Sequence, residues 1–163
     1  FDMYGTVFDV NGLGFKLRAL PAIGAAKEPA LNAMWRSKQL EYTFRRSTMG
    51  CYVPLTSCTR QALDFCCDAL DAQLTEAEKV DLCSAYLRLP AFPDCRPGLE
   101  ALKAGGHRCL AFSNGTQKDV TSLIASANLQ DCFEDRVVVV DDMPKPVFKP
   151  SPEVYHFFTS QAE

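Results

Sequence analysis

Residues 109–140, CLAFSNGTQKDVTSLIASANLQDCFEDRVVVV, decide the fold class that the sequence predicts. Two apolar runs at the ends of this stretch, residues 109–112 and 137–140, predict strands. The second run is β-branched throughout, as in a strand that is buried on both faces of a sheet. Between them, residues 116–127 place apolar side chains at helical spacing. A strand, a helix and a strand in this order predict two parallel strands joined by a crossover helix.

The same alternation continues on both sides of this unit. A helix is predicted before it, with Pro97 near its first position and Gly105-Gly106 at its end. Another helix begins after it, at Ser151-Pro152-Glu153. The stretch FDMYGTVFDV, residues 1–10, predicts the end of a strand followed by a glycine turn. We therefore expect an α/β fold whose core is a Rossmann-like sheet of parallel strands.

The segment from residue 11 to residue 90 differs, because it predicts helices and no strand. Residues 11–30 are rich in Gly, Ala and Pro, and they predict a loop with one short helix. Two longer helices follow at about 31–49 and 59–71. The face that the first of these is predicted to turn inward consists of Leu31, Met34, Trp35, Lys38 and Tyr42.

A third helix in this segment begins at the capping box Thr75-Glu76-Ala77-Glu78. It carries Val80, Cys83 and Leu87 at helical spacing. An all-helical insert between the first strand and the rest of the sheet predicts a cap over an active site. The two expected domains are an α/β core of residues 1–10 and 91–163 and a helical cap of residues 11–90.

The composition narrows the classes of function. The net charge of −3 comes with no basic patch, which argues against nucleic acid as a partner. No apolar run reaches the length of about 18 residues that a membrane span needs. The eight cysteines form no C-x-x-C motif and the histidines are only His107 and His156, so a metal site has little support. Disulfides remain an alternative, but buried free thiols in a reducing cytoplasm are the favoured interpretation.

Four polar clusters fall where the strands are expected to end, which is where open parallel sheets bind ligands. They are Asp2 with Tyr4-Gly5-Thr6, then Ser113-Asn114-Gly115, then Asp141-Asp142, and finally Lys149. A carboxylate and an ammonium that converge there, beside hydroxyl and amide groups, predict a covalent catalytic site. Each cluster also has a structural alternative: a turn Asp, a Ser-Asn-Gly helix cap, a loop start, or a solvated Lys.

Four segments together resemble the L-2-haloacid dehalogenases of the haloacid dehalogenase superfamily. FDMYGTVFDV matches the first superfamily motif, D-x-x-G-T, in the form D-x-Y-G-T-x-F-D that is typical of these dehalogenases. WRSKQLEYTFRRSTMG, residues 35–50, resembles their W-R-x-K-Q-L-E-Y-T cap segment, which is far more specific. FSNG, residues 112–115, and VFKPSPEVY, residues 147–155, resemble the second motif and the lysine motif. The resemblance runs from residue 1 to about residue 158.

The resemblance implies hydrolytic dehalogenation through a covalent ester. Asp2 aligns with the nucleophile, which attacks C2 of a small 2-haloacid and expels the halide. Lys149 aligns with the cation that keeps this nucleophile ionised and offsets charge during ester hydrolysis. Arg36 aligns with the cap arginine that receives the halide, and Asn114 aligns with a second contact on that side. The implied product is a 2-hydroxyacid of inverted configuration.

The remaining matches imply supporting roles. Thr6 and Ser113 align with donors that orient the nucleophile and the substrate, and Tyr4, Leu40 and Tyr155 align with the lining of the pocket and its supports. The resemblance also implies a reaction without a cofactor or a metal. No acid is needed for the leaving group, because a halide is a weak base that leaves without a proton. Members of this family often form homodimers through cap and core helices, so a homodimer is one expectation for the partner.

Tyr4 argues against the main alternative, a phosphatase or phosphonatase of the same superfamily. Phosphatases of this superfamily carry a second Asp two residues after the nucleophile, and Tyr4 holds that place here. A third hypothesis is a truncated, inactive paralogue. It has support because the family's Ser-x-Asn-x-x-Asp type motif would fall just after residue 163, so we expect a fragment whose C-terminal strands are missing.

Overall fold

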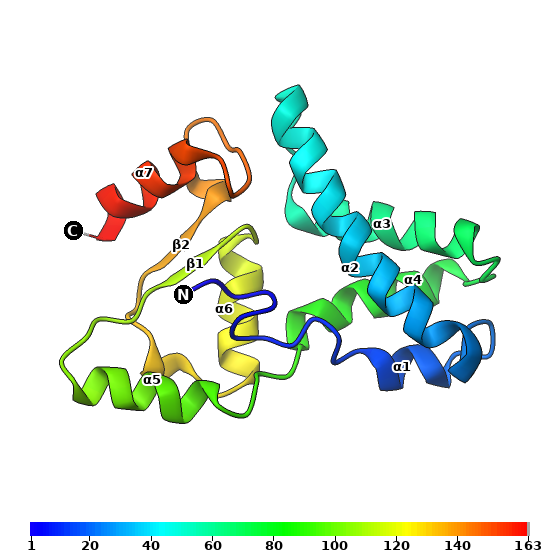
Figure 1. Ribbon diagram of the computed structural model, residues 1–163, viewed down its shortest axis with the longest axis horizontal. Coiled ribbons are helices and arrows are strands. Elements are labelled where there is room, and N and C mark those ends of the chain that lie inside the picture. The colour runs from blue at the N-terminus through cyan, green and yellow to red at the C-terminus, as the bar shows by residue number, and fades with distance from the viewer. Residues whose placement is uncertain (163) are drawn as a thin grey trace. The chain divides into compact units, whose positions relative to one another are not determined.

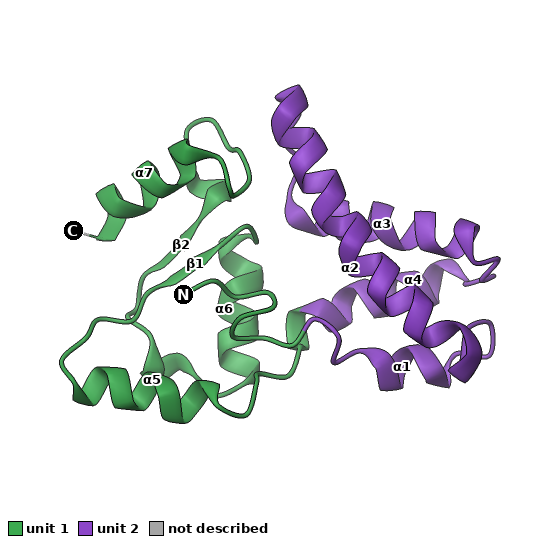
Figure 2. Ribbon diagram, viewed as in Figure 1, with its two compact units in different colours: residues 1–9, 87–163 green, residues 10–86 purple. Residues whose placement is uncertain are grey.

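The structure, a computed structural model that describes residues 1–162, divides into two compact units (Figure 2). Unit 1 consists of Phe1–Asp9 and Leu87–Glu163, and unit 2 consists of Val10–Tyr86. The chain leaves unit 1 after Asp9 and returns to it at Leu87, so the sequence of unit 2 is inserted into that of unit 1.

Unit 1 is built on a short parallel sheet (Figure 1). Strand β1 (Ala111–Ser113) pairs in parallel with strand β2 (Val137–Val139), and Phe112 lies opposite Val138. The predicted parallel pairing is therefore confirmed, although β1 begins two residues later than residue 109. Burial explains the short strands, because every residue of β1 is buried and Val138 and Val139 are buried as well.

Helices alternate with the two strands along the chain in the predicted order. They are α5 (Cys95–Ala104), α6 (Gln117–Ser126) and α7 (Pro152–Ala162), with 3₁₀ turns η2 (Gln130–Cys132) and η3 (Val140–Asp142). Helix α6 begins where the Thr116 hydroxyl accepts a hydrogen bond from the backbone nitrogen of Asp119 at 3.2 Å. Its buried face, Val120, Leu123 and Ile124, is the predicted one apart from half-buried Ala127. The strand–helix–strand order predicted from residues 109–140 is thus confirmed.

Unit 2 contains only helices among its described elements. They are α1 (Gly14–Ala19), α2 (Gly24–Met49), α3 (Leu55–Ala69) and α4 (Glu76–Ala85), with the 3₁₀ turn η1 (Tyr86–Arg88) at the boundary. The predicted capping box of α4 is confirmed. The Thr75 hydroxyl accepts from the backbone nitrogen of Glu78 at 3.3 Å, while the Glu78 carboxylate accepts from the backbone nitrogen of Thr75 at 2.7 Å.

Helix α2 begins at Gly24, so the prediction of a start near residue 31 is wrong. Pro29 and the surrounding Gly and Ala residues favour a loop locally, but contacts with the preceding segment stabilise the helix. The Glu28 carboxylate accepts hydrogen bonds from the Arg18 guanidinium at 2.9 and 3.0 Å. One turn later, the Asn32 amide donates to the carbonyl of Asn11 at 3.0 Å.

The inward face of α2 also differs from the prediction. Its buried residues are Glu28, Leu31, Asn32, Trp35, Gln39 and Thr43. Lys38 and Tyr42 are only half-buried, whereas the polar Gln39 and Thr43 are fully buried. Hydrogen bonds explain this exchange, because a buried amide or hydroxyl is tolerated when it is paired. Helix α4 shows a similar shift: Val80 is 51% exposed, and Leu82 and Ala85 are buried instead.

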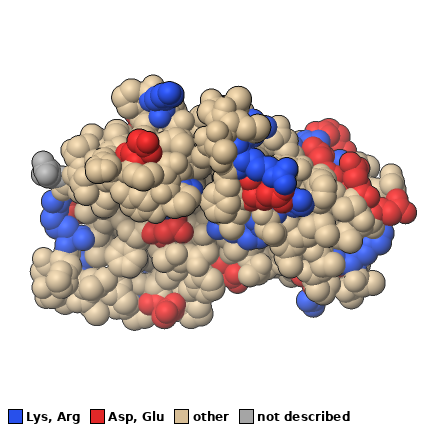
Figure 3. Space-filling view, turned by 45° about the horizontal axis from the view of Figure 1, so that its top comes forward, with Lys and Arg blue, Asp and Glu red and all other residues tan. Residues whose placement is uncertain are grey.

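Charged side chains of both signs lie next to one another in Figure 3. On α2, Glu41 contacts Lys38 at 2.7 Å and Arg45 at 2.6 Å. On α3, Arg60 contacts Asp64 of the same helix and Glu76 of α4. Within residues 1–162, no helix combines the length and the apolar content needed to cross a membrane.

All eight cysteines are unpaired in the described structure. Five of them are buried: Cys58, Cys66, Cys67, Cys109 and Cys132. Their small apolar side chains therefore pack as part of the interior of the two units.

Candidate active site

Asp2 lies just past the sheet of unit 1. The backbone nitrogen of Phe1 donates to the carbonyl of Leu110 at 2.7 Å, and the backbone nitrogen of Phe112 donates to the carbonyl of Phe1 at 2.8 Å. This is the pattern of neighbouring parallel strands, so Phe1 runs beside β1 on the side away from β2. Asp2 therefore follows at the carboxyl end of the sheet, where the sequence predicts a ligand site.

A tight turn after Asp2 brings Thr6 back toward it. The backbone nitrogen of Phe8 donates to the carbonyl of Met3 at 2.9 Å, and Gly5 has a φ of +95°, which a side chain would disfavour. The Thr6 hydroxyl then lies 3.4 Å from Asp2 Oδ2, a long hydrogen bond at an exposed position. The turn thus places a hydroxyl donor beside the second oxygen of the carboxylate.

Lys149 provides the positive charge of the site. Its Nζ atom lies 2.6 Å from Asp2 Oδ1 and 2.9 Å from the carbonyl oxygen of Phe112. The side chain of Lys149 is 13% exposed, whereas that of Asp2 is 43% exposed. The ammonium is therefore largely sheltered, while the carboxylate keeps one side open to a reactant. An ionised carboxylate held in this way can act as a nucleophile.

Asn114 and Ser113 connect the end of β1 to this pair. The side-chain carbonyl of Asn114 accepts a hydrogen bond from the backbone nitrogen of Lys149 at 2.9 Å. Ser113 is fully buried, and its hydroxyl oxygen accepts from the backbone nitrogen of Gly115 at 3.0 Å. Asn114 therefore holds the loop of Lys149, and Ser113 shapes the turn that presents Asn114.

Two of the predicted pocket residues, Tyr4 and Tyr155, also belong to unit 1. Tyr4 is buried, and a Cβ atom on Gly115 would come within 3.1 Å of Cε2 of its ring and 3.2 Å of its hydroxyl. A side chain at residue 115 would therefore crowd the Tyr4 ring, which would have to shift by a few tenths of an ångström. Tyr155 on α7 is 46% exposed, and its ring meets that of Phe112 edge-on with centroids 5.7 Å apart.

Phe112 is part of the site, although the sequence does not predict it as a site residue. Its carbonyl accepts from Lys149, and the Lys149 ammonium lies 4.5 Å from the centre of its ring. The ring of Phe158 stacks on it at 4.5 Å. A single Phe in a buried strand looks like an ordinary core residue, so only its position before Ser113 could have drawn attention to it.

The other predicted residues belong to other elements of the fold. Arg36 and Leu40 are half-buried residues of α2 in unit 2. Arg36 Nη1 donates to Gln39 Oε1 at 2.6 Å. Asp141 and Asp142 form part of η3 directly after β2, and both are exposed. The structure therefore brings together Asp2, Thr6, Asn114 and Lys149, with Tyr4, Ser113 and Tyr155 nearby in the same unit.

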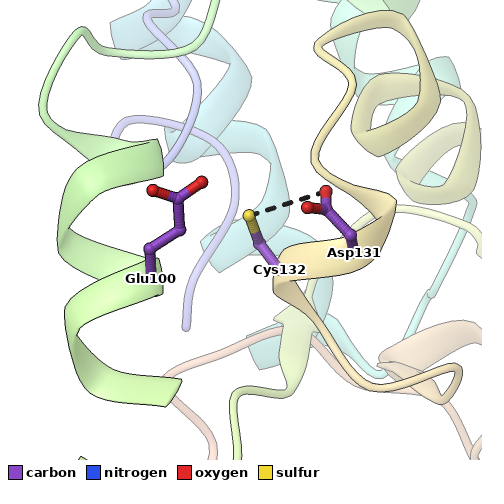
Figure 4. Close-up of side chains that lie close together, drawn as sticks. All are labelled: Glu100, Asp131 and Cys132. Atoms are coloured by element: carbon purple, nitrogen blue, oxygen red, sulfur yellow. Dashed lines mark hydrogen bonds between the residues drawn. The ribbon is translucent and has the colours of Figure 1, made fainter. Parts of the chain in front are cut away.

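A second cluster in unit 1 has the residue types of a metal site. Glu100 of α5 and Asp131 and Cys132 of η2 place one ligand atom each within 4.8 Å of one another (Figure 4). Arg96, however, contacts the Glu100 carboxylate at 2.9 Å and the Asp131 carboxylate at 3.0 Å. Burial also raises the pKa of the Cys132 thiol, which favours the protonated form. The cluster is therefore best described as a network of ion pairs on the surface.

Comparisons with known proteins identify a family for this chain. A family model described as haloacid dehalogenase-like hydrolase matches residues 1–161. An (S)-2-haloacid dehalogenase of Pseudomonas sp. strain YL is 40% identical over 156 residues, covering 95% of this chain and 64% of the relative. Another, (S)-2-haloacid dehalogenase 2 of Pseudomonas sp. strain CBS-3, is 35% identical, with 95% and 65% covered. The chain thus spans slightly less than two thirds of the length of these relatives.

Solved structures of dehalogenases also resemble this chain. An L-2-haloacid dehalogenase from Xanthobacter autotrophicus superposes with a TM-score of 0.85 at 35% identity, covering 98% of this chain and 62% of that one. The same protein has also been solved with chloropropionic acid covalently bound, with equal similarity to this chain.

Proposed function

Because the chain belongs to the haloacid dehalogenase-like hydrolases, we propose that it hydrolyses short L-2-haloacids to 2-hydroxyacids through an ester on Asp2. The observation that carries the proposal is the distance of 2.6 Å between Lys149 Nζ and Asp2 Oδ1. A covalent adduct of chloropropionic acid in a solved relative supports the same chemistry. Lys149 holds one oxygen of this carboxylate through a hydrogen bond, and a carboxylate is a group that can act as a nucleophile.

In the first step, a carboxylate oxygen of Asp2 attacks C2 of the substrate from the side opposite the halogen. The bond from C2 to oxygen forms while the bond from C2 to the halogen breaks, and the halide leaves with the bonding electrons. We assign Arg36 as the cation that receives the halide and Asn114 as a further polar contact. A planar guanidinium that is always charged suits the binding of a departing anion.

In the second step, water attacks the carboxyl carbon of Asp2, and the bond from that carbon to the ester oxygen breaks. The 2-hydroxyacid leaves with that oxygen and one proton of the water, and the other proton passes to solvent as the carboxylate of Asp2 forms again. Negative charge develops on the carboxyl oxygens during this attack. Lys149 Nζ, at 2.6 Å from Oδ1, is well placed to stabilise that charge. The Thr6 hydroxyl, near Oδ2 of Asp2, orients the carboxylate. The second step leaves the configuration at C2 unchanged, so the product keeps the inversion of the first step.

Tyr4 supports dehalogenation over phosphoryl transfer. It occupies the place two residues after the nucleophile, and its buried ring packs against Gly115. A phenol buried there is no substitute for a carboxylic acid that protonates a leaving alcohol, because its ordinary pKa is near 10. A halide leaving group needs no such proton, and the ammonium of Lys149 supplies the positive charge beside the nucleophile.

Further parts of the proposal concern the setting of the reaction. Unit 2 would act as a cap that carries Arg36 and Leu40 to the substrate, and the protein would work in the cytoplasm, which the eight unpaired thiols support. We also propose a homodimer, which is the assembly that the family resemblance implies. Sedimentation velocity tests this last point, since a single species at the monomer mass at all concentrations would contradict it.

The test of function is chloride release from (S)-2-chloropropionate, with the (R) enantiomer as the control for stereochemistry. We expect release from the (S) form alone, and activity that survives excess chelator. The Asp2→Asn variant should keep the circular dichroism of the wild type but fall below about a hundredth of its rate. Magnesium-dependent hydrolysis of p-nitrophenyl phosphate in place of chloride release would instead establish the phosphatase alternative.

A further inference from the structure

Gln39 is the most deeply buried polar side chain on α2, together with Thr43. It lies one turn after Arg36 and faces α3, with no exposed surface. Its Oε1 atom accepts from Arg36 Nη1 at 2.6 Å, and its Nε2 atom donates to Thr59 Oγ1 at 2.5 Å. A buried amide costs stability unless both of its ends are paired, and here both are.

The direction of each hydrogen bond in this chain is fixed by chemistry. A guanidinium only donates, so the amide oxygen of Gln39 must face Arg36 and its NH₂ group must face Thr59. The Thr59 hydroxyl accepts that bond, and it donates in turn to the carbonyl of Leu55 at 2.9 Å. The relay therefore runs from Arg36 through Gln39 and Thr59 to a helix carbonyl, with one consistent set of donors and acceptors.

The far end of the relay is held rigidly. The indole nitrogen of Trp35 donates to the backbone carbonyl of Thr59 at 2.8 Å, so α2 bonds to Thr59 through both its hydroxyl and its carbonyl. Trp35 is fully buried, and the ring of Tyr86 meets it edge-on at 4.8 Å. Thr59 is thus a fixed anchor, and Gln39 transmits that fixed position to the guanidinium of Arg36.

We propose that Gln39, supported by Thr59, is a positioning residue that sets the orientation of the Arg36 guanidinium for the departing halide. This inference rests on the proposed function, because it assumes that Arg36 receives the halide. The gain is in the chemical step, since an arginine already oriented pays no ordering cost when charge develops on the halogen. Gln39 therefore affects the rate of halide departure more than substrate affinity.

The chain offers a matched control. Arg46 Nη2 of α2 donates to Gln61 Oε1 of α3 at 2.8 Å, which is another Arg–Gln hydrogen bond, here at an exposed position. The Gln61→Met variant removes the same type of contact, an arginine that donates to a glutamine side-chain oxygen, and it leaves Arg36 and Gln39 unchanged. We expect its kcat to equal that of the wild type.

The experiment compares Gln39→Met, Thr59→Val and Thr59→Ser in halide release from (S)-2-chloropropionate. Methionine has nearly the length of glutamine without its hydrogen bonds, and serine keeps the hydroxyl that valine removes. We expect kcat to fall roughly ten- to a hundredfold in Gln39→Met and Thr59→Val, with KM changed less, and Thr59→Ser to stay near the wild type. Equal kcat values in Thr59→Val and Thr59→Ser, or an unchanged kcat in Gln39→Met, would overturn the inference.

A second readout does not depend on turnover. Rotation of the Arg36 Nη groups, followed by ¹⁵N NMR and assigned with an Arg36→Lys variant, should be slow in the wild type and faster in Gln39→Met. Equal rates in the two proteins would contradict the positioning role. If the wild type releases no halide but shows this difference, the proposed function fails while the relay stands. If the wild type releases halide and Gln39→Met releases it at the same rate, the proposed function stands and the positioning role of Gln39 fails.

Discussion

The side-chain carbonyl of Asn114 accepts a hydrogen bond from the backbone nitrogen of Lys149 at 2.9 Å. This bond joins the turn after β1 to the loop before α7, two segments that are 35 residues apart in the sequence. Because the Lys149 ammonium then reaches Asp2 and the Phe112 carbonyl, the position of the charge depends on a contact made by its own backbone.

Substitutions of Asn114 should distinguish its two roles, which are the hydrogen bond with the Lys149 backbone and the proposed contact with the anionic substrate. Asn114→Ala leaves a backbone donor without its acceptor, so we expect a loss of about 1 kcal/mol in unfolding free energy and a roughly tenfold lower kcat. Asn114→Asp keeps an acceptor, so stability should recover, but its added negative charge should still weaken the reaction with a carboxylate substrate. Urea unfolding and steady-state kinetics measure the two effects. Full activity in Asn114→Asp would contradict the assigned contact.

Removing the ammonium of Lys149 should affect the chemistry more than the fold. We expect Lys149→Met to lower kcat by roughly a hundred- to a thousandfold, as when a group that stabilises transition-state charge is removed. Lys145, an exposed lysine of the same loop, provides the control, and Lys145→Met should behave as the wild type. Chloride release measures the activity of both variants, and thermal melts measure their stability. Equal losses in the two variants would indicate disturbance of the loop rather than removal of a charge.

The capping box of α4 gives a prediction on stability alone. Thr75→Ala removes the hydroxyl that accepts from the backbone nitrogen of Glu78, and the expected cost is about 1 kcal/mol. Thr48→Ala is the control, because that exposed hydroxyl only donates back to the carbonyl of Phe44 within α2. Urea unfolding should show the loss in the first variant and little change in the second. The reverse order would mean that the cap does not stabilise α4.

Burial of Cys66 predicts a loss of stability at alkaline pH. Desolvation, with a smaller contribution from Cys67, raises the pKa of its thiol from the ordinary 9.0 to about 12. The folded-state pKa exceeds the unfolded one, so this stabilisation is complete below pH 9.0 and is lost as the pH rises toward about 12. Unfolding free energies at about pH 8 and about pH 10 should therefore differ more in the wild type than in Cys66→Ala. An equal difference would refute the shift.

Much of unit 1 can be predicted from the sequence because its signals are local. The β-branched run at 137–140 and the turn residues after β1 specify strands and a helix start without reference to the rest of the chain. Asp2, Asn114 and Lys149 follow those elements, so their meeting at one sheet edge follows from parallel topology. The motifs that the chain shares with its family then indicate which of the residues at the strand ends belong to the candidate site.

The details of unit 2 are harder to predict from the sequence because tertiary contacts decide them. Gly, Ala and Pro before residue 31 favour a loop, but the Arg18–Glu28 pair and the contact of Asn32 with Asn11 extend α2 to Gly24. Similarly, nothing in the spacing of Gln39 marks it as buried, since its burial requires Thr59 from another helix as a partner. The burial of a polar residue can therefore be recognised only when the position of its hydrogen-bond partner is known.

The fate of the water oxygen tests the central claim most directly, since the account makes Asp2 the atom donor. With enzyme in excess over (S)-2-chloropropionate in H₂¹⁸O, a single turnover should leave ¹⁸O in the carboxylate of Asp2 and unlabelled oxygen at C2 of the product. Mass spectrometry of the Asp2-containing peptide and of the hydroxyacid gives both values. Product labelled at C2, with Asp2 unlabelled, would show direct attack by water and would contradict the covalent mechanism.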